Sequence, residues 1–328
     1  MKKKIKILCT LGPSSLNEKI IKILKKKVDY FRLNMSHLSI QSLKNNIKFL
    51  KKYGIKNICI DTEGAQVRTG NIKAKKLSLN QKVIFYNSLK NKKSYYLYPK
   101  FKFEKIKINT KFLVGFNDLE LKVIKSSKSF LEAKVTKPGL IAPNKGVHFQ
   151  QEIKLDGLTD KDIEAIKIAR KHKINIFALS FANNSQSVKY FRTLIGKSSF
   201  LISKIESLSA LKNLNSIIKN SNAILIDRGD LSRYVPIEAI PVIQKKIIKK
   251  SKKLKTECYV ATNLLESMIQ NNAPTRAESN DINITLESGA SGLVLAAETA
   301  IGKYPNECVN FLKDCIRIFQ KFDSNKYF

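Results

Sequence analysis

Short apolar runs alternate with longer amphipathic segments over most of the chain. Residues 39–53 carry apolar side chains three or four positions apart, the spacing of one helix face, whereas the runs on either side are continuous. Continuous apolar runs that alternate with helices indicate parallel strands buried on both faces. We predict eight such strands, at residues 5–10, 29–34, 56–61, 174–180, 199–205, 223–227, 257–261 and 292–296. The predicted helices span residues 16–27 (capped by Ser15), 39–53, 159–172, 185–195, 237–252 and 305–320.

The pattern changes between residues 71 and 151. Short runs there alternate apolar and polar residues and are separated by polar breaks, which is typical of strands with one exposed face. We predict a small β domain, residues 71–151, inserted after strand three. The remaining residues, 1–70 and 152–328, amount to roughly 250, the usual length of a (β/α)8 barrel. The predicted fold is therefore α/β, a (β/α)8 TIM barrel with an inserted β domain.

The composition adds a large positive charge. Sixty-one Lys and Arg residues stand against 26 Asp and Glu, for a formal net charge of +35. An excess of this size suggests nucleic acid or an anionic surface as a partner. Lys, however, is spread through every segment and only eight of the cations are Arg, the residue that reads bases best. We interpret the charge as a chain-wide bias and expect no specific nucleic-acid binding.

Cysteine usage and hydropathy favour a cytoplasmic protein. The five cysteines form no C-x-x-C pair, which argues against a thiolate metal site and fits a reducing compartment. No apolar run reaches the roughly 18 residues that a membrane span requires. The basic start is followed by a run too short for a signal peptide. We expect neither secretion nor membrane insertion.

Unusual polar residues fall at the carboxyl ends of the predicted strands, where (β/α)8 barrels carry their active sites. Lys204 and Glu206 lie two apart and so point to the same side of one strand, and Asp230 follows the next strand. Two carboxylates at neighbouring strand ends can hold a hard divalent cation, with Lys204 beside it for a phosphoryl group or a carbanion. A purely structural Lys204–Glu206 ion pair is the alternative. The other strand-end residues of this kind are Arg32, Asn34, Asp61, Thr62, Thr262 and Glu298.

Eight segments resemble the pyruvate kinase family and occur in that family's order. They are residues 9–15, 32–37, 61–70, 202–206, 228–231, 261–268, 274–278 and 298–305. The resemblance extends over residues 5–320, and the inserted domain falls where the family has its β-barrel lid. It implies transfer of a phosphoryl group from phosphoenolpyruvate to ADP, giving ATP and pyruvate, in glycolysis.

The resemblance also implies roles for individual residues. Lys204 would neutralise the phosphoryl group in transit, Arg32 would hold phosphate, and Thr262 would help to position the proton for the enolate carbon. The family's Mg²⁺ (or Mn²⁺) ligands correspond to Glu206 and Asp230. The substrate carboxylate would bind the backbone at Arg228, Gly229 and Asp230.

Further residues are implied in binding K⁺ and the nucleotide. A K⁺ site would use oxygens of Asn34, Ser36, Asp61 and Thr62, and the nucleotide would meet Asn34, His37 and Arg68.

The chain departs from the family pattern near these sites. Glu63 stands where Lys is usual, Gln66 where a Glu is associated with K⁺ dependence, and Asp227 where the family has a small residue. These changes leave K⁺ dependence and the preferred nucleotide open. They also keep alternatives in view, a related barrel enzyme with another phosphoryl acceptor or a non-catalytic paralogue. Since the sequence stops after the eighth barrel helix, we expect no C-terminal regulatory domain, no activation by fructose 1,6-bisphosphate, and at most a homodimer through barrel contacts.

Overall fold

The chain folds into two compact units, seen in a computed structural model. The structure describes residues 4–64, 66–88, 94–115, 119–151, 153, 155 and 157–321. One unit comprises Met1–Gly64 and Asp160–Phe328, and the other Ala65–Thr159. The chain thus enters the second unit after Gly64 and leaves it before Asp160, where the sequence suggested 70 and 152. Residues 1, 152 and 328, three of the predicted domain bounds, lie outside the described residues.

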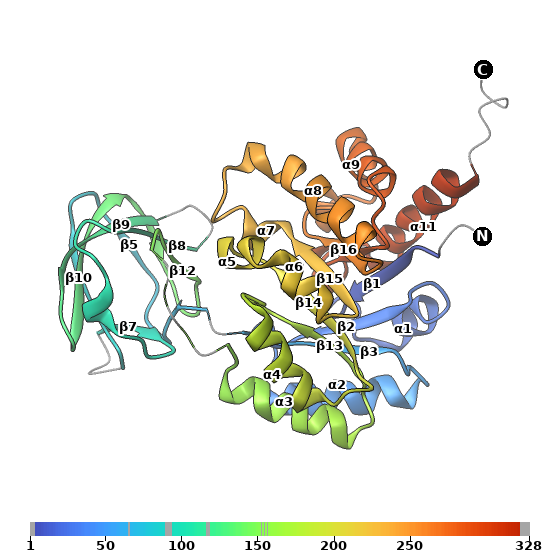
Figure 1. Cartoon of the computed structure of the whole chain (residues 1–328), viewed down its shortest axis with the longest axis horizontal. Helices are drawn as coiled ribbons and strands as arrows, with labels where there is room; N and C mark the ends of the chain where they lie inside the picture. Colours follow the sequence, from blue (N-terminus) through green and yellow to red (C-terminus); the bar gives the residue numbers. More distant parts are fainter. Residues whose placement is uncertain are drawn as a thin grey trace. The chain divides into compact units, whose positions relative to one another are not determined.

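A closed barrel of eight parallel strands forms the first unit (Figure 1). Each strand pairs with the next along the chain, and the last pairs with the first in register Lys6 with Gly292. The (β/α)8 barrel and all eight predicted strands are confirmed. The strands are β1 (Lys6–Thr10), β2 (Tyr30–Asn34), β3 (Ile58–Asp61), β13 (Ile176–Leu179), β14 (Phe200–Ile205), β15 (Ala223–Asp227), β16 (Glu257–Ala261) and β17 (Gly292–Leu295).

Helices cover the outside of this barrel. α2 buries Leu43, Ile47 and Leu50 against it, three of the apolar positions that predicted the helix. The α-helices are α1 (Glu18–Leu24), α2 (Ile40–Lys52), α3 (Asp160–Lys171), α4 (Ser185–Ile195), α5 (Leu208–Lys212), α6 (Leu214–Lys219), α7 (Arg228–Leu231), α8 (Ile240–Lys253), α9 (Arg276–Glu287), α10 (Ala297–Ala300) and α11 (Pro305–Lys321). Short 3₁₀ turns occur at Met35–His37, Phe103–Lys105, Ile237–Ala239 and Glu266–Ile269. Among the described residues, none of the helices is both long and apolar enough to span a membrane.

The helix predictions were wrong in three places. Asn17, not Ser15, caps α1, because its side chain accepts from Ile20 N, whereas the Ser15 hydroxyl accepts from Gly12 N. No helix was predicted between β14 and β15, where the structure has α5 and α6, or between β16 and β17, where it has α9. A capping box between Thr275 and Glu278 starts α9 and is visible in the sequence as T-x-x-E.

The amino ends of the strands carry a polar network of their own. Lys6 Nζ donates to Tyr30 Oη at 3.0 Å and to Glu257 Oε2 at 2.9 Å, and the Tyr259 hydroxyl also donates to Glu257. Lys6, Tyr30 and Glu257 each begin a barrel strand. An ion pair at the amino ends of the strands of a (β/α)8 barrel contributes to stability rather than to chemistry.

The second unit is built of β-strands around its own core. Its largest fully buried side chains include Phe85, Phe103 and Phe112. Seven strands form one sheet in the order β12-β8-β9-β10-β6-β7-β4, and β11 pairs with β5 in a second sheet. The strands are β4 (Arg68–Thr69), β5 (Lys75–Leu77), β6 (Lys82–Tyr86), β7 (Tyr95–Tyr98), β8 (Lys111–Val114), β9 (Leu119–Ser126), β10 (Phe130–Lys137), β11 (Gly139–Ile141) and β12 (Val147–Phe149).

Candidate active site

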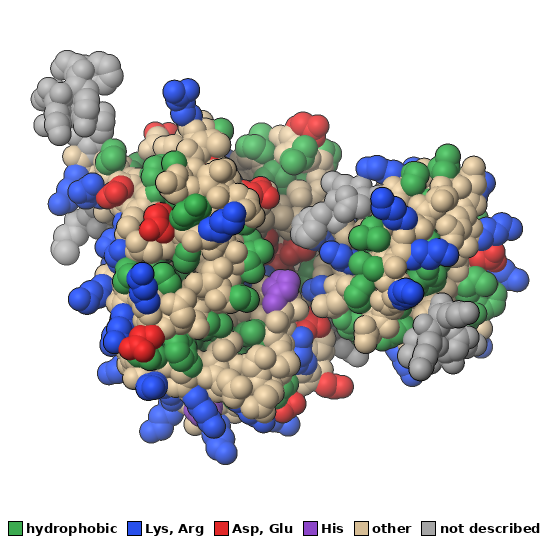
Figure 2. Space-filling view, turned by 180° about the vertical axis from the view of Figure 1, so that it is seen from behind, with side chains coloured by type: hydrophobic (Ala, Val, Ile, Leu, Met, Phe, Trp, Pro, Cys, Tyr) green, Lys and Arg blue, Asp and Glu red, His purple; other side chains and the backbone are tan. Residues whose placement is uncertain are grey.

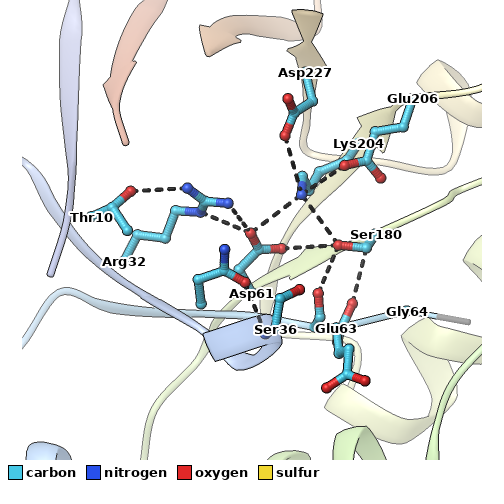
Figure 3. A network of polar contacts seen from close by, with 12 residues as sticks. Thr10, Arg32, Ser36, Asp61, Glu63, Gly64, Ser180, Lys204, Glu206 and Asp227 are labelled. Atoms are coloured by element: carbon cyan, nitrogen blue, oxygen red, sulfur yellow. Dashed lines mark hydrogen bonds and ion pairs between the residues drawn. The ribbon is translucent and has the colours of Figure 1, made fainter. Parts of the chain in front are cut away.

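The carboxyl ends of the barrel strands bring a group of charged side chains together (Figure 3). Arg32 lies on β2, Asp61 ends β3, Lys204 lies on β14 and Asp227 ends β15, while Glu206 directly follows β14. All five are buried. Burial of this many charges is costly unless they pair with one another, so their pairing determines what the site can do.

Lys204 is the centre of this group. Its Nζ lies 2.7 Å from Glu206 Oε1 and 3.4 Å from both Asp61 Oδ2 and Asp227 Oδ2, and it donates to Ser180 Oγ at 3.2 Å. Burial alone would lower the pKa of Lys204, but the three carboxylates outweigh it and raise the pKa above its usual value. Lys204 is therefore a permanent cation held in place from several sides.

Both carboxylate oxygens of Glu206 have partners. Its Oε2 accepts from Phe181 N at 2.6 Å, and its buried Oε1 makes the ion pair with Lys204 at 2.7 Å. Burial, against the opposing effect of Lys204, raises the pKa of Glu206, and the charges of Asp230 and Asp227 raise it further. A raised carboxyl pKa beside other carboxylates means that an additional cation would stabilise the ionised form of the carboxyl group.

Glu206, Asp227 and Asp230 form a group that fits a hard cation. One carboxylate oxygen from each residue lies within 4.8 Å of the others. Oxygen ligands are those that Mg²⁺ and Mn²⁺ favour, and each of the three residues offers one carboxylate oxygen. The sequence indicated Glu206 and Asp230. Asp227 lies beside them in the structure, but its two oxygens already contact Thr262 Oγ1 and Lys204 Nζ.

Arg32 is fixed by its neighbours. Its Nε and Nη2 donate to Asp61 Oδ2 at 2.7 and 2.5 Å, and its Nη1 donates to Thr10 Oγ1 at 2.9 Å. Burial lowers the pKa of Arg32, but Asp61 and Asp227 outweigh this and raise it. The guanidinium thus remains charged at the rim of the group that contains Lys204.

Thr262 follows β16 and is held from three sides. Arg228 donates to its carbonyl from Nε at 3.0 Å and from Nη2 at 2.5 Å, while the Thr262 hydroxyl donates to Asp227 Oδ1 at 2.7 Å. A Cβ at Gly229 would lie 2.9 Å from the Thr262 methyl group, so that position has to be Gly. The guanidinium of Arg228 also binds Asp281 at 2.7–2.9 Å, which leaves its backbone, rather than its side chain, for any substrate.

The residues implied in K⁺ binding lie together, but most of their oxygens already have partners. Asn34 pairs with Asp61 across β2 and β3, and its Oδ1 accepts from Ser36 N at 3.0 Å. The Thr62 carbonyl accepts from Ser180 Oγ at 2.7 Å. Ser180, which also contacts Lys204, was missed by the sequence analysis because a serine after a strand is common.

The loop after β3 is anchored by Asp162, another residue that the sequence analysis missed. Its carboxylate accepts from the backbone N–H groups of Glu63 and Gly64 at 2.7 and 3.0 Å. The Glu63 side chain forms an ion pair with Lys161. The charges of Glu63 and Lys161 therefore cancel each other beside the predicted K⁺ residues.

Three other predicted residues have contacts outside the charged group or belong to the second unit. His37 ends the 3₁₀ turn Met35–His37 and is exposed. Arg68 belongs to the second unit, where its Nη1 donates to Asn144 O at 3.5 Å. Glu298 accepts from the backbone N–H groups of Leu265 and Ala296, which is a structural use of a buried carboxylate.

Comparison with known proteins identifies the family. The family model described as pyruvate kinase, barrel domain, matches residues 2–309, a range that includes all eight barrel strands. The pyruvate kinase of Thermotoga maritima is 34% identical over 330 residues, covering 96% of this chain and 71% of that protein. That of Methanocaldococcus jannaschii is 32% identical, covering 97% and 70%. Plastidial pyruvate kinase 3 of Arabidopsis thaliana is 31% identical, and the chain spans 57% of its length. The chain therefore belongs to the pyruvate kinase family of phosphotransferases.

Proposed function

We propose that this protein transfers the phosphoryl group of phosphoenolpyruvate to ADP, giving ATP and pyruvate. The observation that carries the proposal is Lys204, a buried permanent cation within 3.4 Å of three carboxylates at the carboxyl end of a barrel. Phosphoryl transfer requires fixed positive charge around the group in transit, because charge spreads over its oxygens. A structural ion pair would need one carboxylate, not three.

Lys204 and the residues around it each have a separate role in the proposed reaction. Lys204 stabilises the transferring group, Arg32 holds the phosphate, and Thr262 helps to position the proton that reaches the methylene carbon. The backbone at Arg228, Gly229 and Asp230 binds the substrate carboxylate. The rigid pairing of Arg32 with Asp61 supports this division, since it keeps the guanidinium in one place.

Glu206 and Asp230 would hold a divalent cation, Mg²⁺ or Mn²⁺. The cation would supply positive charge that neutralises oxygens of the substrate. The grouping of carboxylate oxygens from Glu206, Asp227 and Asp230 within 4.8 Å of one another supports this assignment.

Asn34, Ser36, Asp61 and Thr62 would line a K⁺ position, and Asn34 and His37 of the first unit would contact the nucleotide. The Lys161–Glu63 ion pair adds no net charge beside the K⁺ position.

A coupled assay tests the proposal. Purified protein with Mg²⁺, phosphoenolpyruvate and ADP should form pyruvate and ATP in equal amounts, with GDP and K⁺ varied in parallel. The matched control is Lys313→Met, which removes a Lys from the outer helix α11 and should leave the rate unchanged, whereas Lys204→Met should abolish it. Absence of pyruvate from the wild-type protein under all these conditions would refute the proposal.

A further inference from the structure

Asp227 contacts two residues of the proposed reaction, Thr262 and Lys204. Its Oδ1 accepts the Thr262 hydroxyl at 2.7 Å and its Oδ2 lies 3.4 Å from Lys204 Nζ. The side chain is 12% exposed and ends strand β15, so neither contact is a loose surface encounter. The carboxylate belongs to a buried group and not to a solvated strand end.

The Thr262–Asp227 hydrogen bond has a definite direction. A hydroxyl has one proton to give and two lone pairs to offer, and an ionised carboxylate can only accept. Asp227 Oδ1 lies 2.7 Å from Thr262 Oγ1, and the other carboxylate oxygen faces Lys204 Nζ, so the Thr262 proton points to Asp227. The remaining lone pairs of Thr262 Oγ1 are then the part left to face a substrate or a water.

The rest of Thr262 is immobilised by the same segment. Arg228 holds its carbonyl with two donors, and the missing side chain of Gly229 makes room for its methyl group. Three consecutive residues, Asp227, Arg228 and Gly229, thus fix the hydroxyl, the carbonyl and the methyl group of one threonine.

We propose that Asp227 is a positioning residue that makes Thr262 a hydrogen-bond acceptor in the active site. This inference rests on the proposed function. Thr262 then cannot itself donate a proton; it orients a water molecule that does. In that step an O–H bond of the water breaks and a C–H bond forms at the methylene carbon of the enolate. The enolate oxygen re-forms the carbonyl, and the hydroxide left behind takes a proton from bulk solvent.

The inference predicts which step depends on Asp227. Loss of its carboxylate frees the Thr262 hydroxyl to rotate, so proton transfer at the methyl carbon should suffer. Exchange of the pyruvate methyl hydrogens in D₂O, with Mg²⁺ and ATP present, measures that step by NMR. Asp227→Ala and Thr262→Val should each lower the exchange rate by about 100-fold, the usual contribution of a positioned proton-transfer group. Asp227→Asn, which keeps an acceptor oxygen, should lose less.

A double-mutant cycle separates action through Thr262 from action elsewhere. If Asp227 acts through Thr262, the double variant should exchange within about twofold of the slower single variant. Losses that multiply to about 10⁴-fold would mean independent action and would overturn the inference. An unchanged exchange rate in Asp227→Ala would also overturn the inference. So would a Mn²⁺ Kd that rises tenfold or more in Asp227→Ala, measured by calorimetry, because Asp227 would then act on the metal.

Two controls complete the design. Asp314→Ala removes an exposed acid from α11 and should leave the exchange rate unchanged. The wild-type protein must first form pyruvate from phosphoenolpyruvate. Failure there refutes the proposed function, whereas an active wild type with multiplying losses refutes only the role of Asp227.

Discussion

At the scale of single residues, the site is a balance of buried charges. Three cations, Arg32, Lys204 and Arg233, stand among four carboxylates: Asp61, Glu206, Asp227 and Asp230. The carboxylates outnumber the cations, so a bound cation would balance the group. Removal of any member therefore disturbs both the chemistry and the remaining charges.

Lys204→Ala should lower kcat by about 100-fold or more, because the ammonium acts on charge that develops in transit. It should also destabilise the metal-free protein by roughly 3–5 kcal/mol, since the variant leaves buried carboxylates without their partner. Steady-state kinetics and urea unfolding measure the two effects. A variant with wild-type kcat would remove Lys204 from the reaction.

Glu206→Gln and Asp230→Asn should each raise the Mg²⁺ concentration needed for activity and weaken Mn²⁺ binding measured by calorimetry. Each variant removes one anionic oxygen from the proposed ligand set. Glu298→Gln is the matched control, because Glu298 is a buried carboxylate of the same barrel that binds backbone N–H groups. It should lower Tm and leave Mn²⁺ affinity unchanged. Unaltered affinity in both test variants would place the metal elsewhere.

At the scale of elements, the two ends of the barrel strands have separate tasks. The carboxyl ends hold the charged group around Lys204, and the amino ends hold the network of Lys6, Tyr30, Glu257 and Tyr259. The strands in between contribute apolar side chains such as Leu8, Ile202 and Val294 to the barrel interior. Changes at one end should therefore be tolerated by the other.

Glu257→Gln should destabilise the protein by roughly 1–2 kcal/mol, a range discounted for the partial exposure of this ion pair, and leave kcat unchanged. Burial lowers the pKa of Lys6, but its bonds to Tyr30 and Glu257 outweigh this and raise it above 10.5. The stability that the raised pKa of Lys6 contributes is fully present below the pKa of Lys6 in the unfolded state. It is lost only as pH rises through the pKa of Lys6 in the folded state. The deficit of the variant in urea unfolding should thus be equal at pH 7 and at about pH 9. A deficit that disappears by pH 9, or a lowered kcat, would contradict this account.

At the scale of the whole molecule, the positive charge is dispersed. Figure 2 shows Lys and Arg side chains scattered over one face, among apolar and acidic ones, with no continuous patch. The face shown in Figure 2 therefore offers a polyanion many weak contacts and no continuous basic patch.

Nucleic-acid binding should accordingly be weak and insensitive to sequence. Each phosphate contact releases counterions, so binding should disappear between roughly 50 and 200 mM salt. Fluorescence anisotropy with two unrelated duplexes of equal length checks this. A preference for one duplex that survives at physiological salt would reveal a specific site.

The fold could be predicted largely from the sequence, because buried parallel strands are continuous apolar runs and their ends carry the polar residues. α9 escaped prediction because it buries only Ile282, Thr285 and Leu286, too few for a clear apolar face. The contact of Asp227 with Thr262 could not be predicted either. It joins the ends of β15 and β16, and such a contact depends on strand register and on the backbone of Thr262.

That backbone has a thermodynamic consequence. Thr262 has φ +79° and Asn263 φ +57°, two successive left-handed residues without a glycine. A side chain with a Cβ costs about 1–2 kcal/mol in that conformation, so the protein stores strain where its proposed proton transfer takes place. Thr262→Gly and Thr262→Ala lose the same hydroxyl and methyl contacts, but only Gly releases the strain. The glycine variant should therefore unfold at a higher urea concentration than the alanine variant, the reverse of the order expected at ordinary positions. Relief of the strain would raise stability relative to the alanine variant, while loss of the Thr262 hydroxyl makes the enzyme slower than the wild type.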